Sequence, residues 1–218
     1  MFIPEWAGVD PDNGDALWYY NATDENGKVT REKTNDYTVA ALTSNRIATD
    51  DFMPTVYGGF GTTVKAYGVD FSIQASYQLG GTIYDSGYAR LMHAGYNSDA
   101  GTNWHKDIRN AWTTPGQITD VPRLNSLSSN ANYAAATSTR FLTSSDYLSI
   151  NNITIGYTLP KQLVNKLGLT KLRVYFAGDN LAVFSARKGL DPRQSYTTAT
   201  SGTYSAIRTL SGGVSLAF

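Results

Sequence analysis

The sequence predicts an all-β fold, a segment of an antiparallel transmembrane β-barrel with long extracellular loops. Several segments alternate apolar and polar residues with a period of two, which is typical of strands with two different faces. No apolar run approaches the roughly 20 residues that a membrane-spanning helix needs. The chain also ends at Phe218 on an alternating segment. Chain ends usually fray, whereas the last strand of a barrel is ordered because it pairs with another strand.

Composition narrows the class further. Charged residues make up 17% of the chain, its formal net charge is zero and it has no basic run, so nothing favours a nucleic-acid partner. The 15 Tyr and 20 Gly residues favour strands over helices. The cysteine count of zero excludes disulfides and thiolate metal sites.

Residues 1–54 carry turn signals without a sustained period, and we expect an extracellular loop region with at most a short strand at 16–20. Asn26-Gly27 is typical of a tight hairpin turn. Asp10, Asp12 and Asp15 could supply oxygen ligands to calcium, but the downstream bidentate Glu of an EF-hand is missing. A turn stabilised by Asp side chains is favoured.

The remainder, 55–218, is predicted to hold the C-terminal barrel strands. The first two, 55–66 and 69–84, form a long hairpin around Tyr67-Gly68. Residues 85–138 lose the period and are predicted to be an external loop, because so long an irregular stretch is unusual in a compact domain. The third strand spans 139–159.

Within that third strand, Leu148 and Ile150 are out of phase with Ile153 and Ile155, which predicts a bulge near Asn151-Asn152. Pro160 begins a short helix that Gly168 is placed to cap. The fourth strand covers 170–185, an external loop covers 186–202, and the fifth strand covers 203–218. With Phe218 on the periplasmic side, all long connections fall outside and all short ones inside, as in outer-membrane barrels.

The two faces of these strands are predicted to meet different surroundings. The uncharged parity is expected to face outer-membrane lipid: Val56, Phe60, Val64, Val69, Phe71, Ile73, Leu79, Ile153, Ile155, Leu159, Leu172, Val174, Phe176, Val214, Leu216 and Phe218. The opposite parity is expected to face the lumen through Lys65, Asp70, Gln74, Arg173 and Asp179. The charged residues among them are explained equally well as cross-strand ion pairs. Known barrels begin at about 8 strands, so five strands indicate part of a larger barrel.

Two stretches carry a family resemblance. Leu148-Ser-Ile-Asn-Asn-Ile-Thr-Ile-Gly-Tyr-Thr-Leu-Pro160 resembles the strand motif L-x-L-x-N-I-x-L-G-Y-x-L-P of SusC/RagA-family transporters. Residues 172–181 with Lys188-Gly-Leu-Asp-Pro192 resemble the next strand and loop of that family. Residues 6–19 and Tyr57-Gly-Gly-Phe60 are similar to further family segments, so the resemblance covers nearly the whole chain.

The resemblance implies a 22-stranded, TonB-dependent importer of oligosaccharides or peptides in the bacterial outer membrane, with no enzymatic activity and no cofactor. It implies a SusD-like surface lipoprotein and the TonB complex as partners, the latter through a plug and TonB box that this chain does not contain. Val214, Leu216 and Phe218 would form the terminal signal that the barrel-assembly machinery reads.

Aromatic residues in the predicted loops are candidate ligand contacts: Trp104, Trp112, Tyr88, Tyr96 and Trp18. Their rings could stack on sugars or on a partner surface, or they could simply pack the loops or form an interfacial girdle. No metal site is predicted, since the two histidines lack ligand spacing. Two other functions remain open: a soluble glycan-binding β-sandwich module and a porin without energy coupling.

Overall fold

The computed structural model describes residues 1–95, 101–125, 130–194 and 205–218. These residues form two compact units. We call residues 1–51 and 83–143 the loop unit, and residues 52–82, 144–194 and 205–218 the sheet unit. None of the helices in the described ranges has the length and hydropathy needed to cross a membrane.

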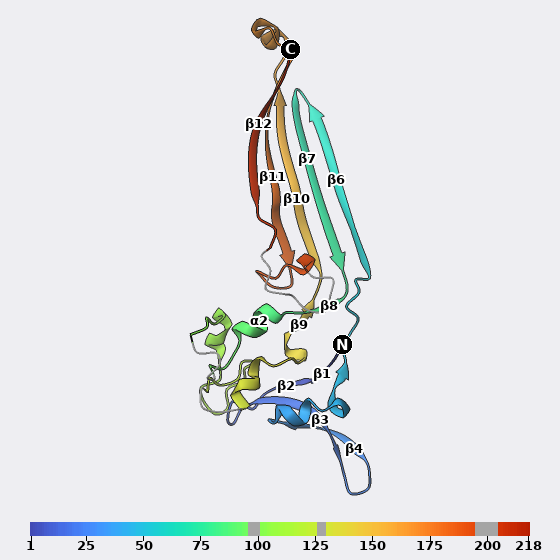
Figure 1. The fold of residues 1–218 in the computed structure, drawn as a ribbon, viewed down its shortest axis with the longest axis vertical. Helices are drawn as coiled ribbons and strands as arrows, with labels where there is room; N and C mark the ends of the chain where they lie inside the picture. Colours follow the sequence, from blue (N-terminus) through green and yellow to red (C-terminus); the bar gives the residue numbers. More distant parts are fainter. Residues whose placement is uncertain (96–100, 126–129, 195–204) are drawn as a thin grey trace. The chain divides into compact units, whose positions relative to one another are not determined.

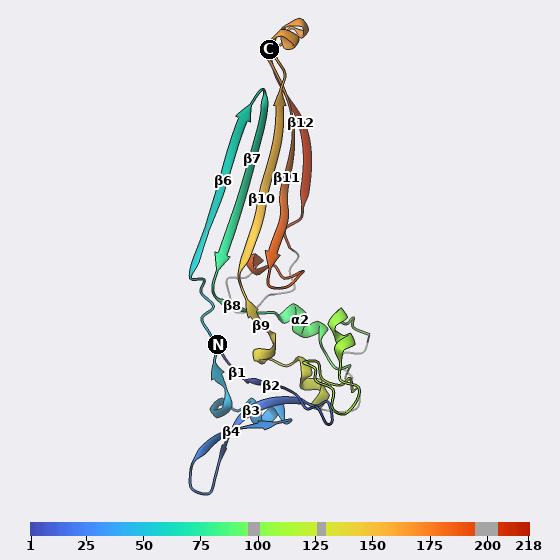
Figure 2. The same ribbon diagram turned by 180° about the vertical axis from the view of Figure 1, so that it is seen from behind.

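The sheet unit is a single antiparallel sheet of five long strands, drawn as side-by-side arrows in Figures 1 and 2. The spatial order is β12-β11-β10-β7-β6, so β6 and β12 are its edges. Its strands are β6 (Val56–Ala66), β7 (Val69–Leu79), β10 (Tyr147–Thr158), β11 (Lys171–Ser185) and β12 (Thr209–Ala217). Most are about twice the common length of 5–6 residues, which is the length that a β-strand needs to cross a bilayer.

The short connections of this sheet follow their local sequence. Tyr67 and Gly68 both have positive φ, at 52° and 84°, and such a pair makes the twisted two-residue turn between β6 and β7. After β10 the chain forms α3 (Lys161–Val164) and η6 (Asn165–Leu167). Gly168 ends this segment with φ 71°, which confirms the predicted cap. The connection after β11 contains η7 (Pro192–Gln194).

The predicted bulge is confirmed. The pairing of β10 with both neighbours shifts register between Ile150 and Asn152. Against β7, Asn151 is the extra residue, whereas on the β11 side the single Asn151 faces two residues, Asn180 and Leu181. Opposite it, Asn180 on β11 adopts φ 52°, a backbone conformation that Asn tolerates better than most side chains. The bulge returns Leu148 and Ile150 to the face that carries Ile153 and Ile155.

Two expected strands are shorter than predicted. The range 69–84 is broken after Leu79 by Gly80 and Gly81, both with positive φ, and continues as β8 (Thr82–Tyr84). The range 139–159 begins as η5 (Thr139–Phe141) and β9 (Leu142–Ser144), which pairs with β8, before β10 starts. The start of the expected strand 203–218 lies partly outside the described residues, and β12 itself begins at Thr209.

The expectation of an irregular loop over 1–54 is wrong. This range contains a three-stranded sheet in the order β2-β3-β4 and a two-stranded sheet of β1 and β5. Its elements are β1 (Phe2–Ile3), β2 (Trp6–Val9), β3 (Ala16–Thr23), β4 (Val29–Thr34), α1 (Tyr37–Ala40), η1 (Thr43–Asn45) and β5 (Ile47–Ala48). The hairpin of β3 and β4 turns around Asn26-Gly27 as predicted. The other strands are too short for a period of two to stand out.

The segment 85–138 is also more ordered than an irregular loop. It contains α2 (Ser86–Leu91), η3 (Lys106–Asn110) and η4 (Asn130–Ala135). Tyr84, Ala89, Met92 and Phe141 belong to one buried cluster of the loop unit. Their irregular spacing explains why no periodic pattern reveals the cluster.

Candidate functional site

The sheet unit presents one apolar and one polar face, and the register assigns every strand residue to one of them. Phe71 on β7 lies opposite Val64 and Ile155, and Ile155 lies opposite Phe176 on β11. In the next row on the same face, Val174 lies opposite Tyr157 and Val214 on β12. Many large side chains of this face are exposed: Val56, Phe60, Val64, Val69, Leu79, Leu148, Ile155, Val174, Phe176, Phe184, Leu210, Val214 and Leu216. A continuous apolar surface of this extent requires a covering medium or partner.

The polar face carries every charged residue of the five strands. These are Lys65, Asp70, Lys171, Arg173 and Asp179. All five predicted lumen residues, including Gln74, share this parity, because Gln74 and Asp70 alternate with Phe71 and Ile73 along β7. The structure thus gathers on one surface residues that lie more than a hundred positions apart in sequence.

An ion pair crosses three strands at one end of this face. The Arg173 guanidinium on β11 donates from Nε to Asp70 Oδ1 at 2.8 Å and from Nη2 to Asp70 Oδ2 on β7. Gly156 on the intervening strand β10 leaves the space that the guanidinium occupies, since a Cβ there would lie 2.7 Å from Arg173 Cζ. The interpretation of these charges as cross-strand ion pairs is confirmed for Asp70 and Arg173.

Of the remaining predicted lumen residues, Lys65 lies beside that pair, whereas Gln74 and Asp179 lie further along the same face, opposite Asn152. Lys65 lies directly opposite Asp70 and, with Lys171 and Ser215, lines the same hollow in the sheet surface. Asp179 accepts a hydrogen bond from Asn152 Nδ2 at 2.7 Å, so it also has a cross-strand partner. The side chain of Gln74 is exposed.

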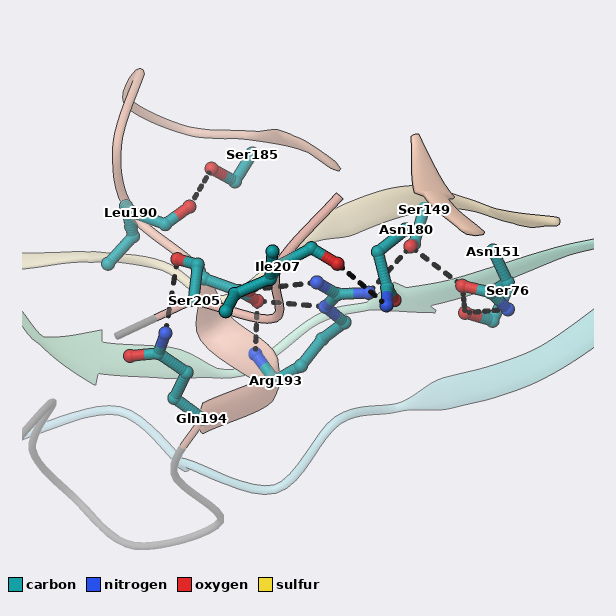
Figure 3. Close-up of polar contacts among 11 residues, drawn as sticks. Ser76, Ser149, Asn151, Asn180, Ser185, Leu190, Arg193, Gln194, Ser205 and Ile207 are labelled. Atoms are coloured by element: carbon teal, nitrogen blue, oxygen red, sulfur yellow. Dashed lines mark hydrogen bonds and ion pairs between the residues drawn. The ribbon is translucent and has the colours of Figure 1, made fainter. Parts of the chain in front are cut away.

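A second polar network is centred on the bulge, at the other end of the sheet (Figure 3). Ser149 is fully buried and its Oγ donates to Asn151 Oδ1 at 2.7 Å. Asn151 Nδ2 in turn donates to Ser76 Oγ on β7 at 3.0 Å. From the connection after β11, Arg193 Nη1 donates to Ser149 Oγ at 2.7 Å. Polar side chains beside the bulge thus hydrogen-bond to Arg193, which lies 44 positions further along the chain.

Arg193 is held in place by Asp191. Its Nε and Nη2 donate to the two carboxylate oxygens of Asp191 at 2.9 and 2.8 Å, a fork geometry that only arginine can supply. These hydrogen bonds to Arg193 hold the pKa of the Asp191 carboxyl below its usual value. The sequence does not predict this network, because Ser149 and Arg193 lie 44 positions apart and neither residue belongs to a pattern that indicates contact with the other.

The aromatic ligand candidates lie in the loop unit and differ in how much of each ring is free. Trp104 stacks on His93 with ring centroids 5.3 Å apart, donates its indole N–H to the His93 carbonyl at 3.0 Å, and is 47% exposed. Trp112 donates to the carbonyl of Pro11 at 3.0 Å and lies against Gly14. Both contacts are of the loop-packing kind, but Trp104 keeps a substantial free surface.

Two further candidates are engaged within the loop unit. The Tyr88 hydroxyl donates to Asp107 at 2.9 Å, and its ring packs edge-on against Phe141. Burial, followed by this hydrogen bond, raises the pKa of Tyr88 to about 12. Tyr96 lies outside the described residues.

Trp18 is not a surface residue, which corrects the prediction that it could contact a ligand. It is 1% exposed and sits between Trp6 and Tyr37, with ring centroids 5.7 and 5.2 Å away in edge-on geometry. Apolar and polar residues do not alternate clearly along β3, because aromatic rings occupy both faces of that strand. Because the packing partners of Trp18 come from separate segments of the chain, the sequence does not reveal that this residue is buried. Its burial removes Trp18 from the candidate site.

The Asp cluster near residue 12 forms a turn. Asp10 Oδ1 accepts the Asp12 backbone N–H at 2.9 Å, and Asp10 Oδ2 accepts Asn13 Nδ2 at 3.0 Å. Asp15 instead forms an ion pair with Arg123 at 2.8 Å. Within the described ranges, no group of three or more potential metal ligands comes together.

No family model matches this sequence. The chain is 27% identical over 187 residues to "TonB-dependent receptor P3" of Formosa agariphila, which covers 81% of this chain and 18% of that protein. It is 29% identical over 170 residues to "TonB-dependent receptor P39" of the same organism, covering 78% of this chain and 15% of that protein. The chain therefore spans less than a fifth of the length of these curated relatives.

Solved structures show the same fold. The whole chain superimposes on 23% of a chain in the structure of the RagAB peptide importer in its "closed-closed" state, with a TM-score of 0.73 and 23% identity. A structure of the RagAB peptide transporter gives a TM-score of 0.73 at 24% identity, again over the whole chain and 23% of that chain. Over about four fifths of its length this chain is thus similar in sequence to two TonB-dependent receptors, and its fold is that of part of the RagAB chains.

Proposed function

We propose that this chain forms part of the wall of a TonB-dependent importer of oligosaccharides or peptides, with its apolar face against lipid and its polar face toward an aqueous lumen. The observation that carries the proposal is the one-sided distribution of charge over five strands whose other face exposes large apolar side chains. A Lys or Arg at the bilayer midplane costs about 2–4 kcal/mol on the lipid side, whereas a wet lumen tolerates charge.

The proposed barrel has 22 strands, of which β6, β7, β10, β11 and β12 are a contiguous set. Both edges of the described sheet would then pair with further strands of the same wall. Val214 and Leu216 follow the apolar parity of β12, and Phe218 lies just beyond it, 88% exposed. This apolar terminal strand is the proposed signal for the barrel-assembly machinery.

The proposed substrate classes and partners come from the resemblance to SusC/RagA-family transporters. The solved neighbours are a peptide importer and a peptide transporter, which supports peptides, and oligosaccharides are the other class proposed here. A SusD-like lipoprotein at the surface and the TonB complex in the periplasm are the proposed partners. Among the aromatic candidates, Trp104 has the most free surface shown, and we assign it to ligand contact ahead of Trp112, Tyr88 and Tyr96.

Uptake by cells with and without the gene of the full-length receptor tests the function. The probes are a ladder of fluorescent oligopeptides and a ladder of fluorescent oligosaccharides. We expect deletion to abolish uptake of one ladder, the restored gene to return it, and a protonophore to block it. Uptake that survives the protonophore would favour a porin without energy coupling. A water-soluble, monodisperse full-length protein would contradict the membrane assignment and favour a glycan-binding module.

A further inference from the structure

The first part of the connection that follows β11, residues 186–194, is folded back onto the polar face of the sheet. Residues 186–194 begin directly after Ser185, and the Ser185 hydroxyl donates to the carbonyl of Leu190 at 2.6 Å. Leu190, Asp191 and Pro192 are buried, although connections between strands usually run over the surface with their side chains in water. This segment, which we call the inward loop, is therefore packed against the sheet (Figure 3).

One arginine fastens the inward loop to the sheet. Arg193 donates to the fully buried Ser149, which belongs to the polar parity of β10, while Asp191 occupies two other N–H groups of the same guanidinium. Hydrogen bonds continue from Ser149 through Asn151 to Ser76 on β7. At the end of the loop, Gln194 Nε2 donates to Ser205 Oγ at 3.1 Å. The loop is thereby joined to β10 and, through the bulge, to β7.

We infer that the inward loop occupies part of the lumen and narrows the substrate path, with Arg193 as the positioning residue that holds it there. This inference rests on the proposed function, because it takes the polar face as the lumen wall. A segment lying on that wall reduces the free cross-section by its own thickness. The pairing of Arg193 with buried Ser149 then sets the size of substrate that passes, so Arg193 determines specificity without touching the substrate.

Thiol labelling of the full-length receptor in intact cells tests whether Arg193 holds the loop. The 218-residue sequence contains no cysteine, so Leu190→Cys introduces a thiol reporter at a buried position of the loop. We expect a membrane-impermeant maleimide to label L190C at least tenfold more slowly than Lys188→Cys, an exposed position of the same loop. Adding R193A should remove most of that difference, and R193K should remove part of it, because lysine cannot form the fork.

Arg208→Ala is the matched control, since Arg208 is exposed beside β12 and should leave the labelling of L190C unchanged. If L190C prevents folding, Pro192→Cys is the second reporter. The inference would be overturned if the reporter cysteine were labelled as fast as K188C, or if its labelling stayed slow in the R193A background.

Uptake separates the lumen claim from a purely structural role. With the oligopeptide and oligosaccharide ladders as probes, R193A should raise the uptake ratio of long to short members severalfold while the amount of folded receptor stays the same. An unchanged ratio would overturn the narrowing. Failure of the parent receptor to import either ladder would instead refute the proposed function, while the labelling result would still decide whether Arg193 holds the loop.

Discussion

Arg173 reaches Asp70 across an intervening strand, and it does so through the space above Gly156. The guanidinium and the carboxylate form a two-pronged contact between β11 and β7, while Gly156 on β10 lies directly opposite Asp70. The ion pair therefore depends on the glycine, since any larger side chain at position 156 would displace the guanidinium.

We predict that Gly156→Ala destabilises the receptor as much as Arg173→Ala, and that the two effects are not additive. Each single substitution leaves Asp70 without its partner, so the double variant should be no less stable than the worse single one. Urea unfolding of the receptor in lipid vesicles measures the cycle. Additive losses would show that Gly156 has a role independent of the pair.

Ser149→Ala should destabilise the sheet unit by about 1–3 kcal/mol, because it removes the partner of both Arg193 and Asn151 at a buried position. Ser215→Ala, on the exposed part of the same face, is the matched control and should cost close to nothing. The same unfolding measurement applies. An equal loss for both variants would mean that the network at the bulge contributes no more than an exposed hydroxyl.

The contact between Asp191 and Arg193 predicts how the inward loop depends on pH. Because the folded state lowers the pKa of Asp191, the stabilisation is complete above the unfolded value of about 3.9 and is lost as the pH falls through the folded value. Hydrogen exchange of residues 186–194 should therefore accelerate below about pH 4 relative to the strands. In Asp191→Asn this acid-dependent step should be absent, and its persistence would assign it to another group.

Two of the three tryptophans predicted as ligand candidates, Trp18 and Trp104, should behave oppositely. Trp18→Ala should destabilise the loop unit by about 3–5 kcal/mol, because it empties a core position between Trp6 and Tyr37. Trp104→Ala should change stability far less and weaken uptake of the imported ladder. Thermal unfolding and the uptake assay distinguish the two; unaltered uptake in W104A would remove Trp104 from the ligand contacts.

The sequence predicts best those strands that have one apolar and one polar face. In β6, β7 and β10 each residue meets one of two faces, so the alternation is strict and even the bulge at Asn151 shows as a slip of phase. The loop unit follows no such rule. Trp18 and Tyr37 come from separate elements, and Tyr37 stacks on Tyr133, almost a hundred positions away. Pairings such as Arg193 with Ser149 depend on the folded path of a connection, which no local pattern records.

The orientation of the sheet is tested most directly by placing a charge on each of two adjacent residues in the middle of β10. Ile155 lies on the apolar face and Thr154 on the polar face. In the full-length receptor folded into lipid vesicles, Ile155→Arg should lower the free energy of unfolding by about 2–4 kcal/mol more than Thr154→Arg. An equal effect, or a greater loss for T154R, would show that the apolar face does not meet hydrocarbon.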